Sequence, residues 1–156
     1  MSSLSKNKDE LTLDDILTSV RTYIEDEEQI AVIEKAYYLA KEKHEGQFRK
    51  SGEAYIYHPM NVALILTSVY ADYETISAGF LHDVLEDCDC TAEELEEAFG
   101  ATITKLVQGV TKLSKIHFST ENDYLIDYYK KIIVGMSEDV RVIIIKLADS
   151  LHNMRT

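Results

Sequence analysis

The chain has 156 residues, of which 46% are hydrophobic and 28% charged, and its formal net charge is −12. This composition is typical of one globular domain and excludes collagen, long disordered chains and repeat arrays. The acidic balance argues against direct DNA binding and against binding to an anionic membrane. It is compatible with a small polyanion such as a nucleotide, provided that a basic loop or a metal ion faces that ligand.

No segment predicts a membrane span or a secretion signal. The longest apolar runs, residues 62–66 and 142–145, are far shorter than the roughly 20 residues that cross a bilayer, and residues 1–13 lack the apolar core of a signal peptide. We therefore expect a cytoplasmic protein. Cys88 and Cys90 are separated by one residue, a spacing too short for an ordinary disulfide, so we expect two free thiols.

Two amphipathic helices are predicted first. Apolar residues recur at helical spacing over residues 13–24, behind Thr12 as a plausible N-cap. A second helix is expected to begin in the acidic stretch 25–28, because negative charge suits a helix N-terminus. Gly46 is expected to end it, since glycine commonly follows a helix.

A polar loop is expected between Gly46 and His58, where two cations and a glycine interrupt the helical pattern. Pro59 is expected to begin a third helix, because proline is tolerated at the first helical position. Its buried positions are expected to be Val62, Ile65, Leu66 and Val69. Residues 76–87 predict a fourth helix that mixes large apolar residues with four ionisable ones.

The rest of the chain predicts further helices and an all-α fold. Thr91 and Glu94 resemble a capping box for a short helix that Gly100 closes. The later expected elements are a helix built on Ile103, Leu106, Val107 and Val110, a polar joint over 114–120, and helices over 122–136 and 138–154. Residues 142–145 alone would also suit a buried strand, but no second strand candidate accompanies them, so we favour a helix.

The segment His82-Asp83-Val84-Leu85-Glu86-Asp87 is the most informative part of the sequence. In a continuous helix His82 would lie beside Glu86, and Asp83 beside Asp87. Three carboxylates so close together repel one another unless a cation or protons neutralise them, and the apolar neighbours indicate burial. A divalent metal ion is the simplest explanation. His58 and Asp149 are candidate ligands from other helices, although neither is compelling by itself.

Several motifs together resemble the hydrolase domain of the RelA/SpoT alarmone enzymes, a branch of the HD phosphohydrolases. The motifs, in the family's order, are Arg49-Lys50-Ser51-Gly52 running to Tyr55 and His58-Pro59, then residues 81–87, Val110-Thr111-Lys112-Leu113, and residues 146–156. The resemblance implies an HD-domain helical bundle over residues 26–156, preceded by an N-terminal helical segment over residues 1–25. Because the chain stops at Thr156, directly on the last motif, we expect an N-terminal fragment of a long bifunctional member, in which synthetase and regulatory domains follow.

The resemblance also implies a reaction and a site. The expected activity is hydrolysis of the 3′-pyrophosphate of guanosine tetra- or pentaphosphate, which yields GDP or GTP and pyrophosphate. The expected Mn²⁺ ligands are His58, His82, Asp83 and Asp149. Glu86 and Asp87 are expected to orient or deprotonate the attacking water. The expected substrate-binding residues are Arg49, Lys50, Ser51, Asn153 and Thr156.

Two alternatives stay open at this point. The chain could be an HD phosphohydrolase of another nucleotide, or an inactive HD domain that regulates an attached synthetase. The presence of all six metal-binding and catalytic positions argues for an active enzyme. Ser150 and Cys88 stand where long family members usually have Arg and Thr, departures that are expected to tune the rate rather than change the reaction. His44, His117 and His152 are expected to be structural or surface residues.

Overall fold

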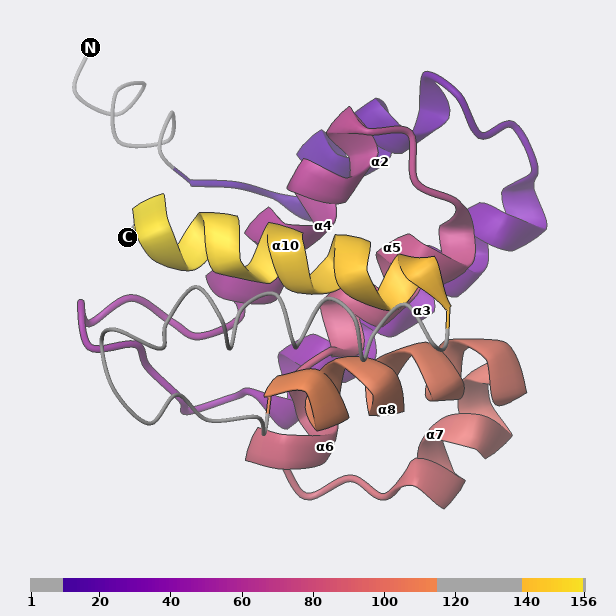
Figure 1. Ribbon diagram of the computed structural model, residues 1–156. Helices are drawn as coiled ribbons and strands as arrows, with labels where there is room; N and C mark the ends of the chain where they lie inside the picture. Colours follow the sequence, from indigo (N-terminus) through magenta and orange to yellow (C-terminus); the bar gives the residue numbers. More distant parts are fainter. Residues whose placement is uncertain (1–9, 115–138, 156) are drawn as a thin grey trace, which may run out of the picture.

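The computed structural model describes residues 10–114 and 139–155, and within these ranges the chain is all-α, as the sequence predicts. The described residues contain one pairing of extended backbone, an isolated bridge between Phe48 and Ala54. The helices, which Figure 1 shows in chain order, are α2 (Leu13–Arg21), α3 (Glu27–Lys43), α4 (Tyr57–Ser68), α5 (Tyr73–Leu81), α6 (Val84–Asp87), α7 (Ala92–Phe99), α8 (Ala101–Ser114) and α10 (Val140–Arg155).

Helix α2 begins at the predicted cap and packs against α4. The Thr12 hydroxyl accepts the backbone N–H of Asp15 at 3.2 Å, and the Asp15 carboxylate accepts the N–H of Thr12 at 2.9 Å. This reciprocal pair satisfies donors that have no partner within the helix. The Ser19 hydroxyl then donates to Thr67 Oγ1 of α4 at 2.7 Å. The predicted division of the chain at residue 26 stays a prediction.

Helix α5 forms the centre of the molecule. It contacts α3, α4, α8 and α10, and every residue from Thr75 to Leu81 is buried. In Figure 1, α10 and α8 run side by side across α5. Gly79 lets α4 approach closely, since a Cβ at this position would lie 2.6 Å from Leu66 Cδ1.

The third helix begins earlier than predicted. Helix α4 starts at Tyr57, so Pro59 is its third residue rather than its first. This position is still tolerated, because the N–H groups of the first turn have no acceptor within the helix. The predicted burial of Val69 is wrong, since α4 ends at Ser68 and Val69 is 59% exposed. Ile65 is half-buried, whereas Val62 and Leu66 are fully buried.

The prediction of one continuous helix over residues 76–87 is also wrong. Helix α5 ends at Leu81 and α6 begins at Val84, with His82 and Asp83 between them. The His82 ring donates from Nδ1 to the carbonyl oxygen of Gly79 at 2.7 Å. That carbonyl is the acceptor that the N–H of residue 83 would use in a continuous helix, so the side chain competes with the backbone. His82 and Glu86 therefore do not share one uninterrupted helical face.

The C-terminal helix is confirmed as a helix rather than a strand. Helix α10 contains the whole apolar run 142–145, of which Val142, Ile143 and Ile145 are buried. The predicted helix over 122–136 lies outside the described residues, as does most of the predicted joint at 114–120. Within the ranges that the structure describes, no helix combines the length and apolar character needed to cross a membrane.

Candidate metal centre

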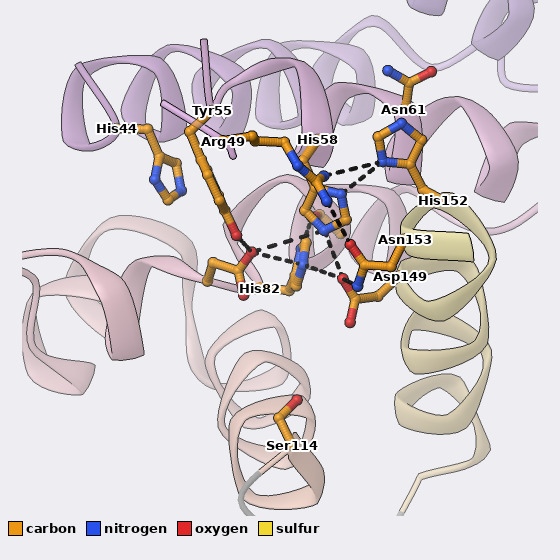
Figure 2. A network of polar contacts seen from close by, with 12 residues as sticks. His44, Arg49, Tyr55, His58, Asn61, His82, Ser114, Asp149, His152 and Asn153 are labelled. Carbon is orange, nitrogen blue, oxygen red and sulfur yellow. Dashed lines mark hydrogen bonds and ion pairs between the residues drawn. The ribbon is translucent and has the colours of Figure 1, made fainter. Parts of the chain in front are cut away.

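The four predicted metal ligands meet at one point, although they come from three separate segments. His58 lies in the first turn of α4, His82 and Asp83 form the break between α5 and α6, and Asp149 lies in α10. One ligand atom from each residue can be chosen so that all four lie within 4.8 Å of one another. Figure 2 shows His58, His82 and Asp149 pointing toward a common centre.

The distances within this cluster suit a single ion. His58 Nε2 lies 2.6 Å and His82 Nε2 3.1 Å from Asp149 Oδ1. Asp83 Oδ2 lies 3.0 Å from His82 Nε2 and 4.0 Å from His58 Nε2. Ligands about 2.1 Å from one ion stand roughly 3 Å apart when they subtend a right angle at it. Two imidazole nitrogens with two carboxylate oxygens form a donor set that suits a divalent first-row metal.

Contacts behind the cluster orient its members. Because the Nδ1 of His82 donates to the Gly79 carbonyl, Nε2 is the ring nitrogen that faces the cluster and is left for a metal ion. The Tyr55 hydroxyl donates to Asp83 Oδ2 at 2.5 Å. Lys146 Nζ donates to Asp149 Oδ2 at 3.0 Å, which leaves Oδ1 directed at the two histidines. His82, Asp83 and Asp149 are thus each held by a partner outside the cluster.

The charges and hydrogen bonds within the cluster affect the pKa values of its members more strongly than burial does. Burial opposes the charged form of His82, but the carboxylates of Asp83 and Asp149 hold its pKa well above 6.5. Burial also opposes ionisation of Asp83, yet His82 and the Tyr55 hydroxyl lower its pKa to about 2. The pKa of Asp149 is likewise held far below its ordinary value, since hydrogen bonds from His58 and His82 outweigh burial. Both carboxylates are therefore ionised at neutral pH and attract a cation.

Glu86 and Asp87, the predicted catalytic pair, lie on α6 directly after the cluster residues. Both side chains are exposed, and neither belongs to the group of four ligands. Partial burial, together with the charges of Asp83 and Glu86, raises the pKa of Asp87 above its ordinary value. A carboxylate with a raised pKa accepts a proton more readily than an ordinary one.

Two of the predicted substrate-binding residues contact each other beside the cluster. Arg49 Nη2 donates to Asn153 Oδ1 of α10 at 2.8 Å. Lys50 and Ser51 follow Arg49 in an exposed turn that Gly52 completes with a φ of 92°, in the left-handed region that favours glycine. Of the three polar side chains in this turn, that of Arg49 reaches the edge of the cluster, where it contacts His152 and Asn153. Thr156 lies outside the described residues.

Some neighbours of the cluster are not among the predicted site residues. Tyr55 belongs to one of the sequence motifs without a predicted role, yet its hydroxyl contacts Asp83. His152 is 6% exposed, and its Nδ1 lies 2.7 Å from Nδ1 of His58. The sequence contains a signal for the position of His152, because residues three apart on a helix share a face and His152 follows Asp149 by three.

His44 is buried against Cys88, which is a free thiol as predicted, as is Cys90. His117 lies outside the described residues.

Comparison with known proteins gives one consistent result. The family model described as HD domain matches residues 36–156. The bifunctional (p)ppGpp synthase/hydrolase SpoT of Escherichia coli K12 is 47% identical over 137 residues, which are 88% of this chain and 19% of that protein. The guanosine-3′,5′-bis(diphosphate) 3′-pyrophosphohydrolase of Aquifex aeolicus is 52% identical over 124 residues, or 80% of this chain and 17% of that protein.

A solved structure supports the same relationship. It is that of a metazoan ortholog of SpoT that hydrolyzes ppGpp and plays a role in starvation responses, and it superposes with a TM-score of 0.64 at 31% sequence identity. The match covers 80% of this chain and 69% of that one. The chain spans about a fifth of the length of the curated relatives that it matches.

Proposed function

Because the chain belongs to the HD domain family, in the group that includes the SpoT enzymes, we propose that it hydrolyses guanosine 3′,5′-bis(diphosphate), ppGpp, and its pentaphosphate analogue at the 3′-pyrophosphate. The products are pyrophosphate with GDP or GTP, so the reaction removes the alarmone of the stringent response. The observation that carries this proposal is the position of the Arg49–Asn153 pair beside the cluster of two histidines and two aspartates.

We propose Mn²⁺ as the ion, held by His58, His82, Asp83 and Asp149. The mixed nitrogen and oxygen donors suit this class of divalent ion, and the contact of His82 with the Gly79 carbonyl leaves the correct nitrogen directed at it. When bound, such an ion polarises a phosphoryl oxygen and makes water a better nucleophile. The two ionised aspartates offset the charge of the ion within a largely buried site.

The protein's own groups supply the proton transfer. The attacking water forms a bond to the inner phosphorus of the 3′-pyrophosphate while the bond from that phosphorus to the 3′ oxygen breaks, and the 3′ oxygen takes up a proton to become the hydroxyl of GDP or GTP. Glu86 and Asp87 lie one turn beyond Asp83 and can orient the water and accept its proton. The raised pKa of Asp87 favours this role, because a base works best when its pKa approaches the working pH.

The substrate is held by the loop and by the last turns of α10. Arg49 and Lys50 provide the positive charge that phosphate oxygens require, with the Ser51 hydroxyl as a further donor. Asn153, together with Thr156, is assigned to the guanosine. Because Arg49 and Asn153 already contact each other, phosphate and nucleoside contacts converge within one small region next to the metal ligands.

Product analysis tests this function directly. The purified chain is incubated with ppGpp and Mn²⁺, and the products are separated by anion-exchange chromatography beside an Asp83→Ala control. We expect GDP and pyrophosphate from the wild-type chain and neither from the variant. Release of 5′-phosphate, or rapid hydrolysis of GTP or dGTP with ppGpp left intact, would assign the chain to another nucleotide. Tight Mn²⁺ binding without hydrolysis of any of these nucleotides would favour a regulatory domain.

The relatives also suggest how this chain is used. The Escherichia coli relative is described as both synthase and hydrolase, and the matched region is 19% of its length. We propose that a synthetase domain and regulatory domains accompany this hydrolase domain in a longer protein. Expression of the longer reading frame, followed by assays of synthesis from GTP and ATP, tests this part separately.

A further inference from the structure

His152 connects the metal cluster with the substrate-binding loop. It lies on α10 three residues after Asp149 and one before Asn153, so it faces the cluster from the same helix. Its flanking residues, Leu151 and Asn153, are exposed, whereas His152 is 6% exposed. Figure 2 shows it against His58, on the side away from His82. A buried imidazole at this place needs polar partners, and His58 and Arg49 are among those that the described residues provide.

His58 and Arg49 contact the same nitrogen of His152. His152 Nδ1 lies 2.7 Å from His58 Nδ1 and 3.5 Å from Arg49 Nη1. The two histidine rings also stack, with 5.0 Å between their centroids and 30° between their planes. Arg49 can only donate, so its contact requires a lone pair on His152 Nδ1. The nitrogen of His152 is therefore the acceptor in both contacts.

This assignment places a hydrogen on Nδ1 of His58. Two Nδ1 atoms 2.7 Å apart must share one hydrogen, because two lone pairs or two N–H groups at that distance repel. With His152 accepting, His58 carries a hydrogen on Nδ1, so Nε2 is the ring nitrogen that is left for a metal ion, which would replace the hydrogen that Nε2 shares with Asp149. That Nε2 atom faces the cluster, 2.6 Å from Asp149 Oδ1. It is the atom that a metal ion would use.

We infer that His152 is a positioning residue with two tasks. It holds His58 in the tautomer that ligates metal, and it anchors Arg49 at the edge of the cluster. For His82, the other histidine of the cluster, the backbone carbonyl of Gly79 accepts the Nδ1 hydrogen and so performs the equivalent of this first task. For His58 the acceptor is the side chain of His152, which also contacts Arg49 in the loop that is proposed to bind phosphate. The second task rests on the proposed function, whereas the first rests on metal binding alone.

Two substitutions separate hydrogen bonding from packing. Asn at position 152 can place its side-chain oxygen near the former Nδ1, so His152→Asn keeps the acceptor, while His152→Leu keeps bulk and removes it. The Mn²⁺ affinity of each variant is measured without nucleotide, by competition with a chelating dye. We expect His152→Leu to weaken Mn²⁺ binding by about 10–100-fold, and His152→Asn to stay within about threefold of wild type.

His44→Leu is the matched control. It also removes a buried imidazole, but the hydrogen bonds of His44 go to Gln47 and Cys88 rather than to a metal ligand. We expect near wild-type Mn²⁺ affinity for this control, and circular dichroism establishes that all three variants fold. Wild-type affinity in His152→Leu would overturn the inference. Equal losses in the folded Asn and Leu variants would also overturn it, because packing alone would then explain the effect.

A kinetic measurement tests the second task. At saturating Mn²⁺, His152→Leu should raise KM for ppGpp by about tenfold, and His152→Asn should restore it. Adding Arg49→Ala to His152→Leu should then raise KM less than Arg49→Ala does alone, because the two residues act through one contact. Full additivity would contradict the anchoring of Arg49. A wild-type chain that binds Mn²⁺ but leaves ppGpp intact would refute the proposed function while the affinity test of His58 still holds.

Discussion

The Tyr55 hydroxyl offers a sharp test of how the metal cluster is held. It donates to Asp83 Oδ2 at 2.5 Å, while its ring lies 4.7 Å from the His44 ring and 5.8 Å from the His58 ring, measured between centroids. Tyr55→Phe keeps this ring packing and deletes one hydrogen bond. The substitution therefore changes the position of Asp83 with little disturbance of the fold.

Two estimates give a similar magnitude for this change. A hydrogen bond to a charged group contributes about 1.5–3 kcal/mol, which corresponds to roughly 10–150-fold in an equilibrium constant. Loss of a partner behind a metal ligand costs about 10–100-fold in metal affinity. One effect opposes this loss, since Asp83 without its donor becomes more basic and a stronger ligand. That effect is smaller, because Asp83 has a pKa of about 2 and is already fully ionised at neutral pH.

We therefore expect Tyr55→Phe to raise the dissociation constant for Mn²⁺ by about tenfold or more, measured by chelator competition at neutral pH. Tyr23→Phe is the matched control, because the Tyr23 hydroxyl donates to the carbonyl oxygen of Ala71 at 2.7 Å, on the α4–α5 connection. This control should lose about 1 kcal/mol of stability and retain its Mn²⁺ affinity. Unchanged Mn²⁺ affinity in Tyr55→Phe, or an equal loss of Mn²⁺ affinity in Tyr55→Phe and Tyr23→Phe, would refute the reasoning.

Three further substitutions test other parts of the site. Glu86→Gln should bind Mn²⁺ normally but turn over ppGpp at least ~100-fold more slowly, because an amide cannot accept the proton; unchanged turnover would remove Glu86 from the mechanism. Arg49→Ala should lower kcat/KM by about 10–150-fold, mainly through KM, with unchanged Mn²⁺ content; metal loss would contradict its role as a phosphate contact. Gly79→Ala should lower the Tm by a few degrees and weaken Mn²⁺ binding, and added Leu66→Val should restore both.

Local signals predicted most of the helices, because caps and terminators act over a few residues. Thr12 and Thr91 cap helices as predicted, and Gly100 ends α7 with a φ of 90°. The prediction of one long helix over residues 76–87 is wrong for a reason that the spacing of apolar residues cannot reveal. Its interruption depends on the His82 ring bonding to the Gly79 carbonyl, a competition between side chain and backbone.

The residues behind the cluster were harder to predict than its ligands. The adjacent His82 and Asp83 could be recognised in the sequence, and the motifs suggested His58 and Asp149 as their partners. Tyr55 meets Asp83 across 28 positions, and His152 meets His58 across 94. Such contacts arise only when the helices pack, so no local pattern indicates them. Lys146 is an exception, because it precedes Asp149 by three residues on the same helix.

Packing of the core and geometry of the site are linked at Gly79. The missing side chain of this residue admits Leu66 of α4, the helix that also carries His58. Its carbonyl oxygen orients His82 at the end of α5. An alanine here gains up to about 1 kcal/mol in helix propensity, but a Cβ 2.6 Å from the fully buried Leu66 costs about 1–3 kcal/mol. Leu66 is fully buried, so either its side chain repacks within the core or α4 and α5 move apart, and a shift of α4 moves His58 relative to His82.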